Sequence, residues 1–259
     1  VWFKDFIHDD SYKNLKILNH KTTFFVPNQA TDWRVNTFYT KEPETLKWID
    51  DFDNTKKFIF WDIGSNIGLF SIYAAIKHDN ATIISFEPST SNLRCLSRNI
   101  SINKLEDKIK ILPIALTNKT NHFSMMNEPE FIEGGALNSF GVNFNFEGKK
   151  FKPKMNYQIF ATNIENLINN KILDLPDYIK IDVDGIEHLI LEGAGNCLKN
   201  KKIKKIVVEI NENFDDQKKN VFNILEKSDF KFLNKDHAKE LDNINSKFSK
   251  TYNYFFIKN

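Results

Sequence analysis

Apolar runs of four to eight residues alternate with amphipathic stretches along most of this chain. Seven runs predict strands, at residues 58–61, 82–86, 108–114, 178–181, 203–210, 230–233 and 252–257. The stretches after the first two runs repeat apolar residues at helical spacing, namely Leu69, Ile72, Tyr73 and Ile76, then Leu93, Leu96 and Ile100. Strands that alternate with helices are typical of folds built on a mostly parallel sheet. The pattern predicts a Rossmann-like, three-layer α/β sandwich with seven strands.

Cap residues and weaker apolar patterns predict the remaining elements. Pro43 suits the first turn of a helix over 44–52, and Ser89 is placed to cap a helix over 89–102. Further strands are predicted at 22–26, 120–126 and 156–161, and a short helix at 164–168.

Residues 1–40 and 127–150 show little periodicity. The first segment is aromatic, and its polar–aromatic run around Trp33 is expected to cover the sheet or a binding site, unless Trp33 and Phe38 simply pack there. The second is punctuated by Gly and Pro, and loops of this length inside compact domains are usually functional or disordered. We therefore expect an N-terminal extension over 1–40 and one domain over 41–259.

The clearest candidate for chemistry is the turn after the first predicted strand. The apolar run ends at Asp62, and Gly64, Ser65, Asn66 and Gly68 form the turn before the next helix. Glycine permits positive φ angles and lets a ligand approach the main chain closely. The spacing differs from the G-x-G-x-x-G of dinucleotide sites, and a carboxylate beside the turn would repel a pyrophosphate. The turn instead suits a ligand such as S-adenosylmethionine (SAM), which carries a sulfonium, an amino group and a ribose but no phosphate.

A second acid follows the next strand. Glu87 lies about 20 residues beyond the glycines, where a carboxylate can accept hydrogen bonds from both ribose hydroxyls. Phe86, Pro88 and Ser89 are candidate cofactor contacts beside it. Two incidental acids in an ordinary α/β turn would look similar, but strand, acid, glycine turn, helix, strand and acid occur here in register. No acid follows the third strand, so we expect the adenine contact from the backbone near Ala115 and Leu116.

Four motifs together resemble the FkbM-type methyltransferases. They are Lys41-Glu42-Pro43-Glu44-Thr45, the run from Asp62 to Phe70, Phe86-Glu87-Pro88, and the run from Ile179 to Glu187, and the resemblance covers roughly residues 35 to 230. It implies a class I methyltransferase fold, whose last strand runs antiparallel, and SAM-dependent methyl transfer to a hydroxyl of a sugar or natural product. By family analogy alone, the context is polysaccharide biosynthesis.

The resemblance also bears on single residues. It places Glu42 near the methionine end of SAM, where Glu42 could meet the amino group; a helix N-terminus that favours an acid would explain the residue as well. Asp184 stands where the family more often has Glu. The loop 127–150 lies between the cofactor half and the catalytic half, which suggests an acceptor-binding loop, although a mobile insertion fits nearly as well.

Candidate catalytic residues follow the fourth and fifth strands, because ligands of open α/β sheets bind beyond the carboxyl ends of the strands. Asp182 is expected to be a general base for the acceptor hydroxyl, or a ligand of a metal that acidifies it. Asp182, Glu209 and Asn211 form an all-oxygen set suited to Mg²⁺ or Ca²⁺. Glu209 could instead orient a lysine or a backbone amide. His237 is a further candidate base, although a histidine after the sixth strand is more often a surface residue.

The composition of the chain argues against nucleic acid, zinc and a membrane span as features of this protein. The net charge is +2, and the lysines within 199–205 have no aromatic residues between them, which favours a solvated loop over a nucleic-acid surface. Cys95 and Cys197 give neither zinc spacing nor a disulfide framework. No signal peptide is visible, and no apolar run approaches the ~18 residues of a membrane span, so a cytoplasmic location is expected. The chain begins at Val1, so a further N-terminal part is possible.

Three other functions remain open at this stage. An RNA or DNA methyltransferase would share the fold, but the fourth strand lacks the Asn/Asp-Pro-Pro-Tyr run that holds a base amine. A non-catalytic module that binds a partner through the same fold is disfavoured because Asp62, Glu87 and Asp182 are all present. A nicotinamide enzyme is disfavoured by the glycine spacing. The acceptor, and the oligomeric state, are not predicted from the sequence.

Overall fold

A seven-stranded sheet lies at the centre of the computed structural model, which describes residues 11–150, 152–238, 246 and 248–258. Its strands are β3 (Phe58–Ile63), β4 (Ala81–Phe86), β5 (Ile109–Leu112), β10 (Tyr178–Ile181), β11 (Lys205–Asn211), β12 (Phe230–Asp236) and β13 (Thr251–Lys258). They are arranged in the order β12-β13-β11-β10-β3-β4-β5. Strands β5, β4, β3, β10 and β11 are parallel, whereas β13 is antiparallel to both of its neighbours. The predicted fold class, including the antiparallel last strand, is confirmed.

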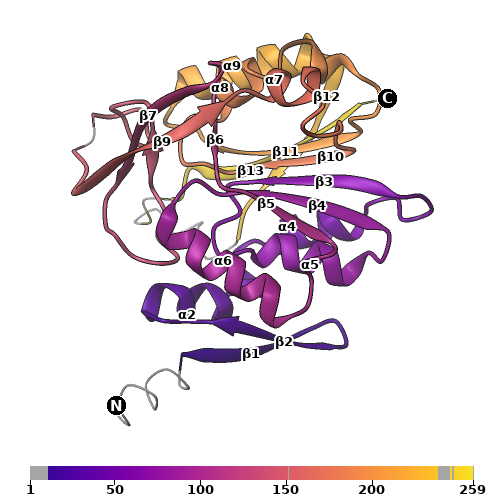
Figure 1. Cartoon of the computed structure of the whole chain (residues 1–259). Coiled ribbons are helices and arrows are strands. Elements are labelled where there is room, and N and C mark those ends of the chain that lie inside the picture. Colours follow the sequence, from indigo (N-terminus) through magenta and orange to yellow (C-terminus); the bar gives the residue numbers. More distant parts are fainter. Residues whose placement is uncertain (1–10, 151, 239–245, 247, 259) are drawn as a thin grey trace.

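Helices cover both faces of this sheet (Figure 1). One layer holds α4 (Pro43–Asp50), α5 (Leu69–Lys77) and α6 (Thr90–Ile102), and the other holds α7 (Ile164–Asn169), α8 (Glu187–Glu192), the 3₁₀ helix η1 (Gly195–Lys199) and α9 (Asp215–Glu226). Each layer closes a separate cluster of buried apolar side chains against the sheet. In the first cluster the rings of Phe52 and Tyr178 stack with centroids 3.8 Å apart. The parallel strands are buried on both faces, which is why they appear in the sequence as continuous apolar runs.

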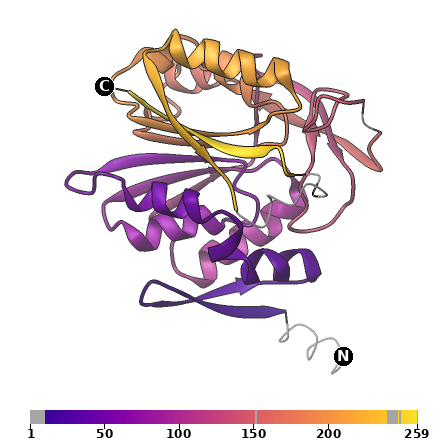
Figure 2. The same cartoon turned by 180° about the vertical axis from the view of Figure 1, so that it is seen from behind.

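The N-terminal segment lies outside the α5 and α6 layer (Figures 1 and 2). It consists of the hairpin β1 (Tyr12–Ile17) and β2 (His20–Phe25), then α2 (Gln29–Asn36) and α3 (Phe38–Lys41). The Phe25 amide donates to Asn99 Oδ1 of α6 at 2.7 Å, and the Arg98 guanidinium of the same helix lies over the Phe25 ring. The sequence predicted one strand and an irregular cover here. The structure corrects this to a hairpin followed by two helices, and residues 1–10 lie outside the described residues.

A second sheet follows β5 and lies at the end of the molecule where the central parallel strands terminate (Figure 1). Its strands, in the order β6-β9-β7-β8, are β6 (Ala115–Leu116), β7 (His122–Glu128), β8 (Ser139–Phe140) and β9 (Met155–Thr162). The predicted strands at 120–126 and 156–161 are therefore confirmed. The prediction that 127–150 is one irregular loop is wrong in part, because it begins inside β7, contains β8 and closes with a bridge between Phe144 and Lys150.

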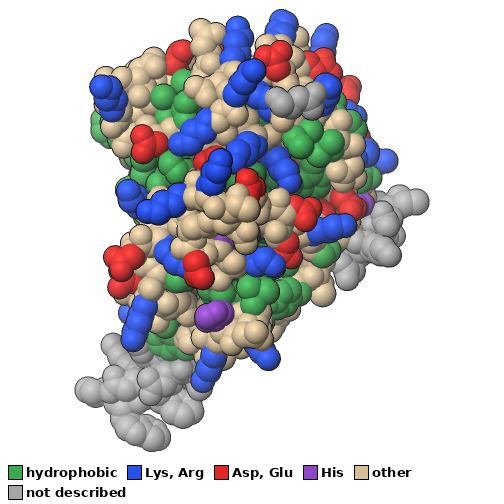
Figure 3. All heavy atoms as spheres, turned by 90° about the vertical axis from the view of Figure 1, so that its right-hand side faces the viewer, with side chains coloured by type: hydrophobic (Ala, Val, Ile, Leu, Met, Phe, Trp, Pro, Cys, Tyr) green, Lys and Arg blue, Asp and Glu red, His purple; other side chains and the backbone are tan. Residues whose placement is uncertain are grey.

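The surface at the opposite end of the parallel strands mixes charges of both signs. Figure 3 shows Lys and Arg side chains spread over this face with Asp and Glu among them. Two lysines of the run 199–205 serve the fold: Lys204 pairs with Asp177 at 3.2 Å, and Lys205 donates to the Asp51 carbonyl at 3.2 Å. Within the described part of the chain, no helix has the length and apolar character needed to cross a membrane.

Candidate functional site

Two adjoining cavities open at the carboxyl ends of β3, β4, β10 and β11. The first, here called the apolar cavity, has a volume of about 70 Å³, and the second, the charged cavity, about 270 Å³. Gly64, Asn66, Asp182 and Asp184 line both of them. The two cavities therefore form one cleft that passes over the glycine turn.

The cavities differ in the chemistry of their walls. The apolar cavity is lined by Phe86, Ile114, Ala115, Leu116, Met126, Phe140 and Ile186, with Glu87, Pro88, Asn92 and Asn138 as polar or turn-forming members. The charged cavity is lined by Arg34, Lys41, Glu42, Glu44, Asp182, Asp184, Glu209 and His237, with Trp33 and Tyr252 among its aromatic members. The apolar cavity suits the purine ring of a ligand such as SAM. The charged cavity, with charges of both signs, suits the amino-acid end of that ligand and a polar acceptor.

The glycine turn joins β3 to α5 and follows the path that the sequence predicts. Gly64 and Gly68 have φ angles of +85° and +89°, in the region that side chains disfavour. The amides of Gly64 and Ser65 donate to the Phe86 carbonyl at 2.9 and 3.0 Å, which fixes the turn to the end of β4. A Cβ at Gly64 would lie 1.8 Å from the Asp182 carbonyl oxygen. Glycine is therefore required here by the neighbouring strand as well as by the backbone angle.

Asp62 is completely buried beneath this turn and lines neither cavity. Its Oδ2 accepts a hydrogen bond of 2.5 Å from Ser71, while its Oδ1 is buried without a partner among the described residues. Burial raises the pKa of Asp62, although the Lys180 ammonium and the Ser71 hydroxyl act in the opposite direction. The structure thus places Asp62 as a support of the turn.

Glu87 lies in the wall of the apolar cavity at the end of β4. Its two oxygens accept from the amides of Asn66 at 2.7 Å and Ser89 at 2.8 Å, and Ser89 Oγ in turn caps α6 at the Asn92 amide. Burial raises the pKa of Glu87 to about 7. A carboxylate can accept about four hydrogen bonds, so capacity remains for two ribose hydroxyls.

Asp182 ends β10, and a buried lysine lies directly beneath it. Lys180 Nζ contacts Asp182 Oδ2 at 2.7 Å. The β3–β10 register sets Lys180 beside Asp62, so one ammonium lies near two carboxylates. Burial would raise the pKa of Asp182, but Lys180 and Lys41 hold it below the usual value. Asp182 is therefore a poor proton acceptor and a stable anion.

Glu209 lies beside Asp182, because Ile181 pairs with Val208 and the two acids are the next residues along their strands. It lines the charged cavity. Burial and the negative charges of Asp182 and Asp184 raise the pKa of Glu209 well above its usual value. Of the two neighbouring acids, Glu209 is the one able to take up a proton near neutral pH.

The predicted metal set is not supported. Asn211 lines neither cavity; its Oδ1 accepts from the Asn213 amide at 2.9 Å and its own amide donates to Gln217 Oε1 at 3.1 Å. Across the described ranges, no group of three His, Cys, Asp or Glu side chains is arranged to hold a metal ion. Asn211 instead organises the turn between β11 and α9.

The turn after β10 is built by two further acids. Asp184 has a φ of +63°, and its Oδ2 accepts from the Leu137 amide at 2.7 Å. Burial, and then the charge of Asp182, raises the pKa of Asp184 to about 6. Glu187 is buried and accepts from the amides of Val183 and Gly185 and from the Gln217 side chain. Glu187 therefore holds the turn and does not line the cleft.

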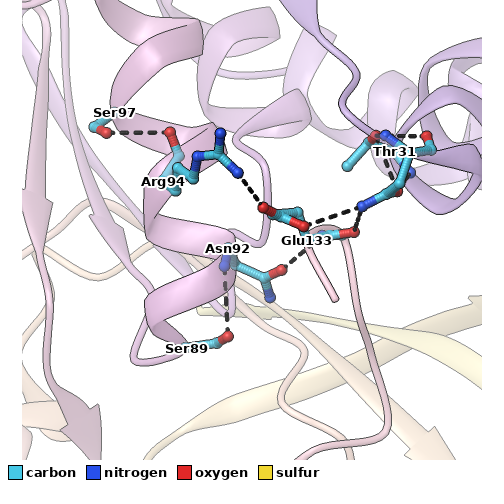
Figure 4. A network of polar contacts seen from close by, with 8 residues as sticks. Thr31, Ser89, Asn92, Arg94, Ser97 and Glu133 are labelled. Atoms are coloured by element: carbon cyan, nitrogen blue, oxygen red, sulfur yellow. Dashed lines mark hydrogen bonds and ion pairs between the residues drawn. The ribbon is translucent and has the colours of Figure 1, made fainter. Parts of the chain in front are cut away.

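Residues 132–137, here called the strap, cross the cleft from the side of α2 and α6 to the turn after β10. Asn66 Nδ2 donates to the Gly135 carbonyl at 2.7 Å, and Arg34 Nε donates to the Gly134 carbonyl at 2.6 Å. Figure 4 shows Glu133 between two elements: one carboxylate oxygen is paired with Arg94 at 2.5 Å, and Asn28 Nδ2 donates to the other at 3.2 Å. Part of the predicted loop thus lies over the cleft, fixed by polar contacts.

The contacts of Glu133 predict faster cofactor exchange when they are removed. Because Arg94 is 59% exposed, the ion pair contributes only about 0.2–1 kcal/mol, so Glu133→Ala should raise the dissociation rate of SAM by roughly 1.4- to 5-fold. Stopped-flow displacement of bound SAM would measure the rate. Glu130→Ala removes an exposed pair with Lys154 and should leave the rate unchanged; equal rates in both variants would show that Glu133 does not restrain the strap.

Unpartnered acceptors in the walls of the cleft show whether SAM fits it. Glu42 Oε2 in the charged cavity and Asn66 Oδ1, where the two cavities meet, are buried and have no partner within the described residues. Both are acceptors, and buried acceptors without donors are rare and costly. The α-amino group of SAM is a cation with three N–H donors. The site residues therefore fit the amino-acid end of SAM, as Glu87 and the apolar walls fit its adenosine.

The comparison with protein families agrees with this geometry. The sequence model of the methyltransferase FkbM domain matches residues 62–241, from the acid before the glycine turn to the segment after β12. This chain belongs to the FkbM methyltransferase family. The FkbM domain accordingly contains the glycine turn, Glu87, Asp182 and Glu209, while Arg34, Lys41 and Glu42 precede the matched range.

Two curated relatives of the FkbM domain are methyltransferases. Methyltransferase sdnD of Sordaria araneosa is 26% identical over 152 residues, which cover 51% of this chain and 59% of sdnD. Hexuronic acid methyltransferase AglP of Haloferax volcanii is 21% identical over 200 residues, which cover 77% of this chain and 74% of AglP.

Solved structures also resemble the chain. Precorrin-6y C5,15-methyltransferase of Geobacter metallireducens is 14% identical, with 84% of this chain and 87% of that chain covered and a TM-score of 0.47. TYW2 of M. jannaschii in complex with AdoMet is 12% identical, with 96% and 87% covered and a TM-score of 0.46. Both TM-scores lie below 0.5, and no assignment in the site depends on them.

The structure brings most of the predicted site residues together. Gly64, Asn66, Glu87, Asp182, Glu209 and His237 line the cleft, together with Glu42, Phe86 and Pro88, whereas Asp62, Ser65, Gly68 and Ser89 shape the turns behind it. His237 stacks on Tyr252 with ring centroids 4.0 Å apart. Ala115 and Leu116 line the apolar cavity, where the adenine contact was expected.

Sequence reasoning missed Lys180, although a lysine inside a short buried strand is a signal, since it needs nearby carboxylates. The run around Trp33 was expected to cover the sheet or a binding site, and Trp33 and Arg34 line the charged cavity. The sequence did not single out the Arg34 guanidinium, or the strap within 127–150, because their contacts at the cleft form only in the fold.

Proposed function

We propose that this protein is a SAM-dependent O-methyltransferase that acts on a hydroxyl of a sugar or glycoconjugate. The observation that carries the proposal is the pairing of Asp182 and Glu209 at the end of adjacent strands, within an FkbM domain whose cleft has an apolar half and a charged half. AglP, a relative, is named a hexuronic acid methyltransferase, which supports a sugar as the acceptor.

SAM, when bound, supplies a methyl group on a sulfonium, so the methyl carbon is already activated for in-line displacement. The acceptor oxygen forms a bond to this carbon while the carbon–sulfur bond breaks and the electron pair stays on sulfur. The hydroxyl proton must leave, and Glu209 is proposed to take it. Asp182, held as an anion by Lys180 at 2.7 Å, lies beside Glu209 and keeps its pKa high enough for that role.

The walls of the charged cavity are suited to a sugar. Trp33 is 49% exposed and lines this cavity, so a sugar ring has an aromatic face to contact. Glu44, Asn253 and Thr251 add polar groups, and Asn253 Nδ2 already donates to Glu44 Oε1 at 2.8 Å. Polar residues at fixed positions among aromatic residues would orient one hydroxyl toward Glu209.

SAM binding of the wild type and of Glu87→Ala tests the cofactor part of this proposal. Glu87 holds the turn through two amides and is the proposed ribose acceptor, so its loss should weaken SAM binding at least tenfold, or about 1.4 kcal/mol. Isothermal titration calorimetry would measure it, with Asp62→Ala as a second variant. Glu165→Ala, on α7 away from the cleft, is the control and should bind SAM as the wild type does. A wild type that binds no SAM would exclude the proposed activity.

An RNA or DNA methyltransferase is the alternative function. The described walls of the charged cavity hold five acids beside Arg34 and Lys41, and these acids would repel a phosphate backbone, which gives this alternative little support. Methylation of short RNA that falls steeply with salt, with no transfer to uronic acids or hexoses, would favour it over a sugar acceptor.

A further inference from the structure

Two cations of the charged cavity come from the N-terminal segment, outside the range 62–241 that matches the FkbM domain. They are Arg34 of α2 and Lys41 at the end of α3. Five acids line the same cavity: Glu42, Glu44, Asp182, Asp184 and Glu209. Among the described residues of these walls, the acids repel a ligand carboxylate, and Arg34 and Lys41 are the two lysine or arginine side chains that attract it.

The Arg34 guanidinium is already oriented. Its Nε donates to the Gly134 carbonyl at 2.6 Å, which fixes one edge of the planar group to the strap. Its two Nη atoms have no hydrogen-bond partner in the described part of the chain, although the residue lines the cavity. Arginine binds carboxylates through two parallel N–H groups, so a pre-oriented guanidinium with free Nη donors is suited to one.

Lys41 and Glu42 place a donor and an acceptor side by side. Lys41 Nζ contacts Glu42 Oε1 at 2.6 Å, and Glu42 Oε2 is buried without a described partner. Glu42 itself is 6% exposed, so this unused oxygen is costly unless a ligand donor meets it. A cation next to an unused acceptor is what an α-amino acid, with its ammonium and carboxylate, would require.

We propose that Arg34, with Lys41, forms a carboxylate-binding subsite that the N-terminal segment adds to the FkbM domain. The inference rests on the proposed function, because it takes the cleft to bind SAM and a sugar. Two ligands bring this chemistry: SAM, through its α-carboxylate, and an acidic sugar, through its own carboxylate. In either case the subsite selects a carboxylated ligand over the same ligand without the group.

Decarboxylated SAM, which lacks only the α-carboxylate, tests the cofactor arm. Calorimetry would give the ratio of the dissociation constants for decarboxylated SAM and SAM in the wild type, Arg34→Gln and Lys41→Met. If SAM is the ligand, the wild-type ratio should be at least about 10 and should fall toward 1 in Arg34→Gln. Arg34→Gln also loses the Gly134 contact, but that loss weakens both ligands alike and leaves the ratio unchanged.

Glucuronic acid and glucose, offered as methyl glycosides, test the acceptor arm in the same proteins. If the acceptor is the ligand, the wild type should prefer the acid in kcat/KM by about tenfold, and Arg34→Gln should lose this preference. Arg98→Gln is the matched control, because Arg98 lies on α6 over Phe25 and lines neither cavity; it should keep both ratios.

The outcomes separate this inference from the proposed function. Loss of carboxylate selectivity in Arg34→Gln, in either arm, supports the subsite and identifies its ligand. A wild type that binds SAM but selects for a carboxylate in neither arm, or an Arg34→Gln protein that keeps every preference, overturns the subsite alone. A wild type that binds neither form of SAM overturns the proposed function and the subsite with it.

Discussion

Gly64→Ala should abolish SAM binding, with at least a hundredfold loss of affinity. The residue has a φ of +85°, which costs an alanine about 1–2 kcal/mol. The added Cβ would also lie 1.8 Å from the Asp182 carbonyl oxygen and 2.8 Å from its carbonyl carbon. Main-chain atoms cannot rotate away, so β3 and β10 must separate where the two cavities meet. Calorimetry with SAM would measure the loss, and circular dichroism would show whether the fold persists.

Gly141→Ala is the matched control for this prediction. Gly141 also has a positive φ, of +68°, but its Cβ would lie 3.2 Å from a serine hydroxyl and not against main chain. Gly141 is not among the residues that line the two cavities. This variant should be modestly less stable and should bind SAM normally. If Gly64→Ala binds SAM as well as Gly141→Ala does, the turn is not held against β10 as the structure shows.

Glu209→Gln should lower kcat by about 10²- to 10⁴-fold and leave the dissociation constant of SAM nearly unchanged. Glutamine keeps the shape of the side chain but cannot accept the hydroxyl proton. In the wild type, kcat should rise with pH through the raised pKa of Glu209, because the base must first be deprotonated. Initial rates from pH 5 to 9 would show this rise, and the residual activity of Glu209→Gln should lack it.

Although Glu209→Gln should lower kcat, it should raise the stability of the folded protein above neutral pH. The folded-state pKa of Glu209 is raised above the usual 4.5, so the native state retains a proton that the unfolded state has lost. The corresponding stability is present below about pH 4.5 and is lost as pH rises through the folded pKa. Glu209→Gln cannot ionise, so its melting temperature should match that of the wild type at pH 4 and exceed it at pH 8.

Either measurement can refute the assignment of the base. An unchanged kcat in Glu209→Gln would return the role to His237 or to Asp182. If the melting temperature of Glu209→Gln does not rise relative to that of the wild type between pH 4 and pH 8, then Glu209 ionises in the native state as easily as in the unfolded state. His237→Asn, which changes another wall residue of the charged cavity, should affect kcat far less than Glu209→Gln.

The central sheet could be predicted because its signals are local. Strand β10 is predicted at its observed bounds, since a four-residue apolar run ended by an acid has few other interpretations. The β1–β2 hairpin was half missed, because strand β1 carries Lys13, Asn14 and Lys16 and resembles a polar loop. Strand β8 has two residues and pairs only through the fold, so no window of sequence contains its signal.

The site divides in the same way. The turn residues and Glu87 could be found from the sequence because they belong to one βαβ unit, in which spacing along the chain determines position in the fold. Arg34 and Asn66 meet the strap, at Gly134 and Gly135, only in three dimensions, and Arg34 is 100 residues from Gly134 along the chain. The proposal of Glu209 rather than Asp182 as the base also needed the structure, because it depends on the ion pair between Lys180 and Asp182.

The place of β13 in the central sheet has a consequence for where the protein can be divided. This strand lies between β11 and β12, yet it is the last element of the chain and falls beyond the matched range 62–241. A fragment cut at those limits would lack β13, which pairs with both β11 and β12, and would leave one long edge of each unpaired, a known cause of aggregation. In this chain, the range that matches the family model is thus smaller than the folding unit, and segments on both sides of that range complete it.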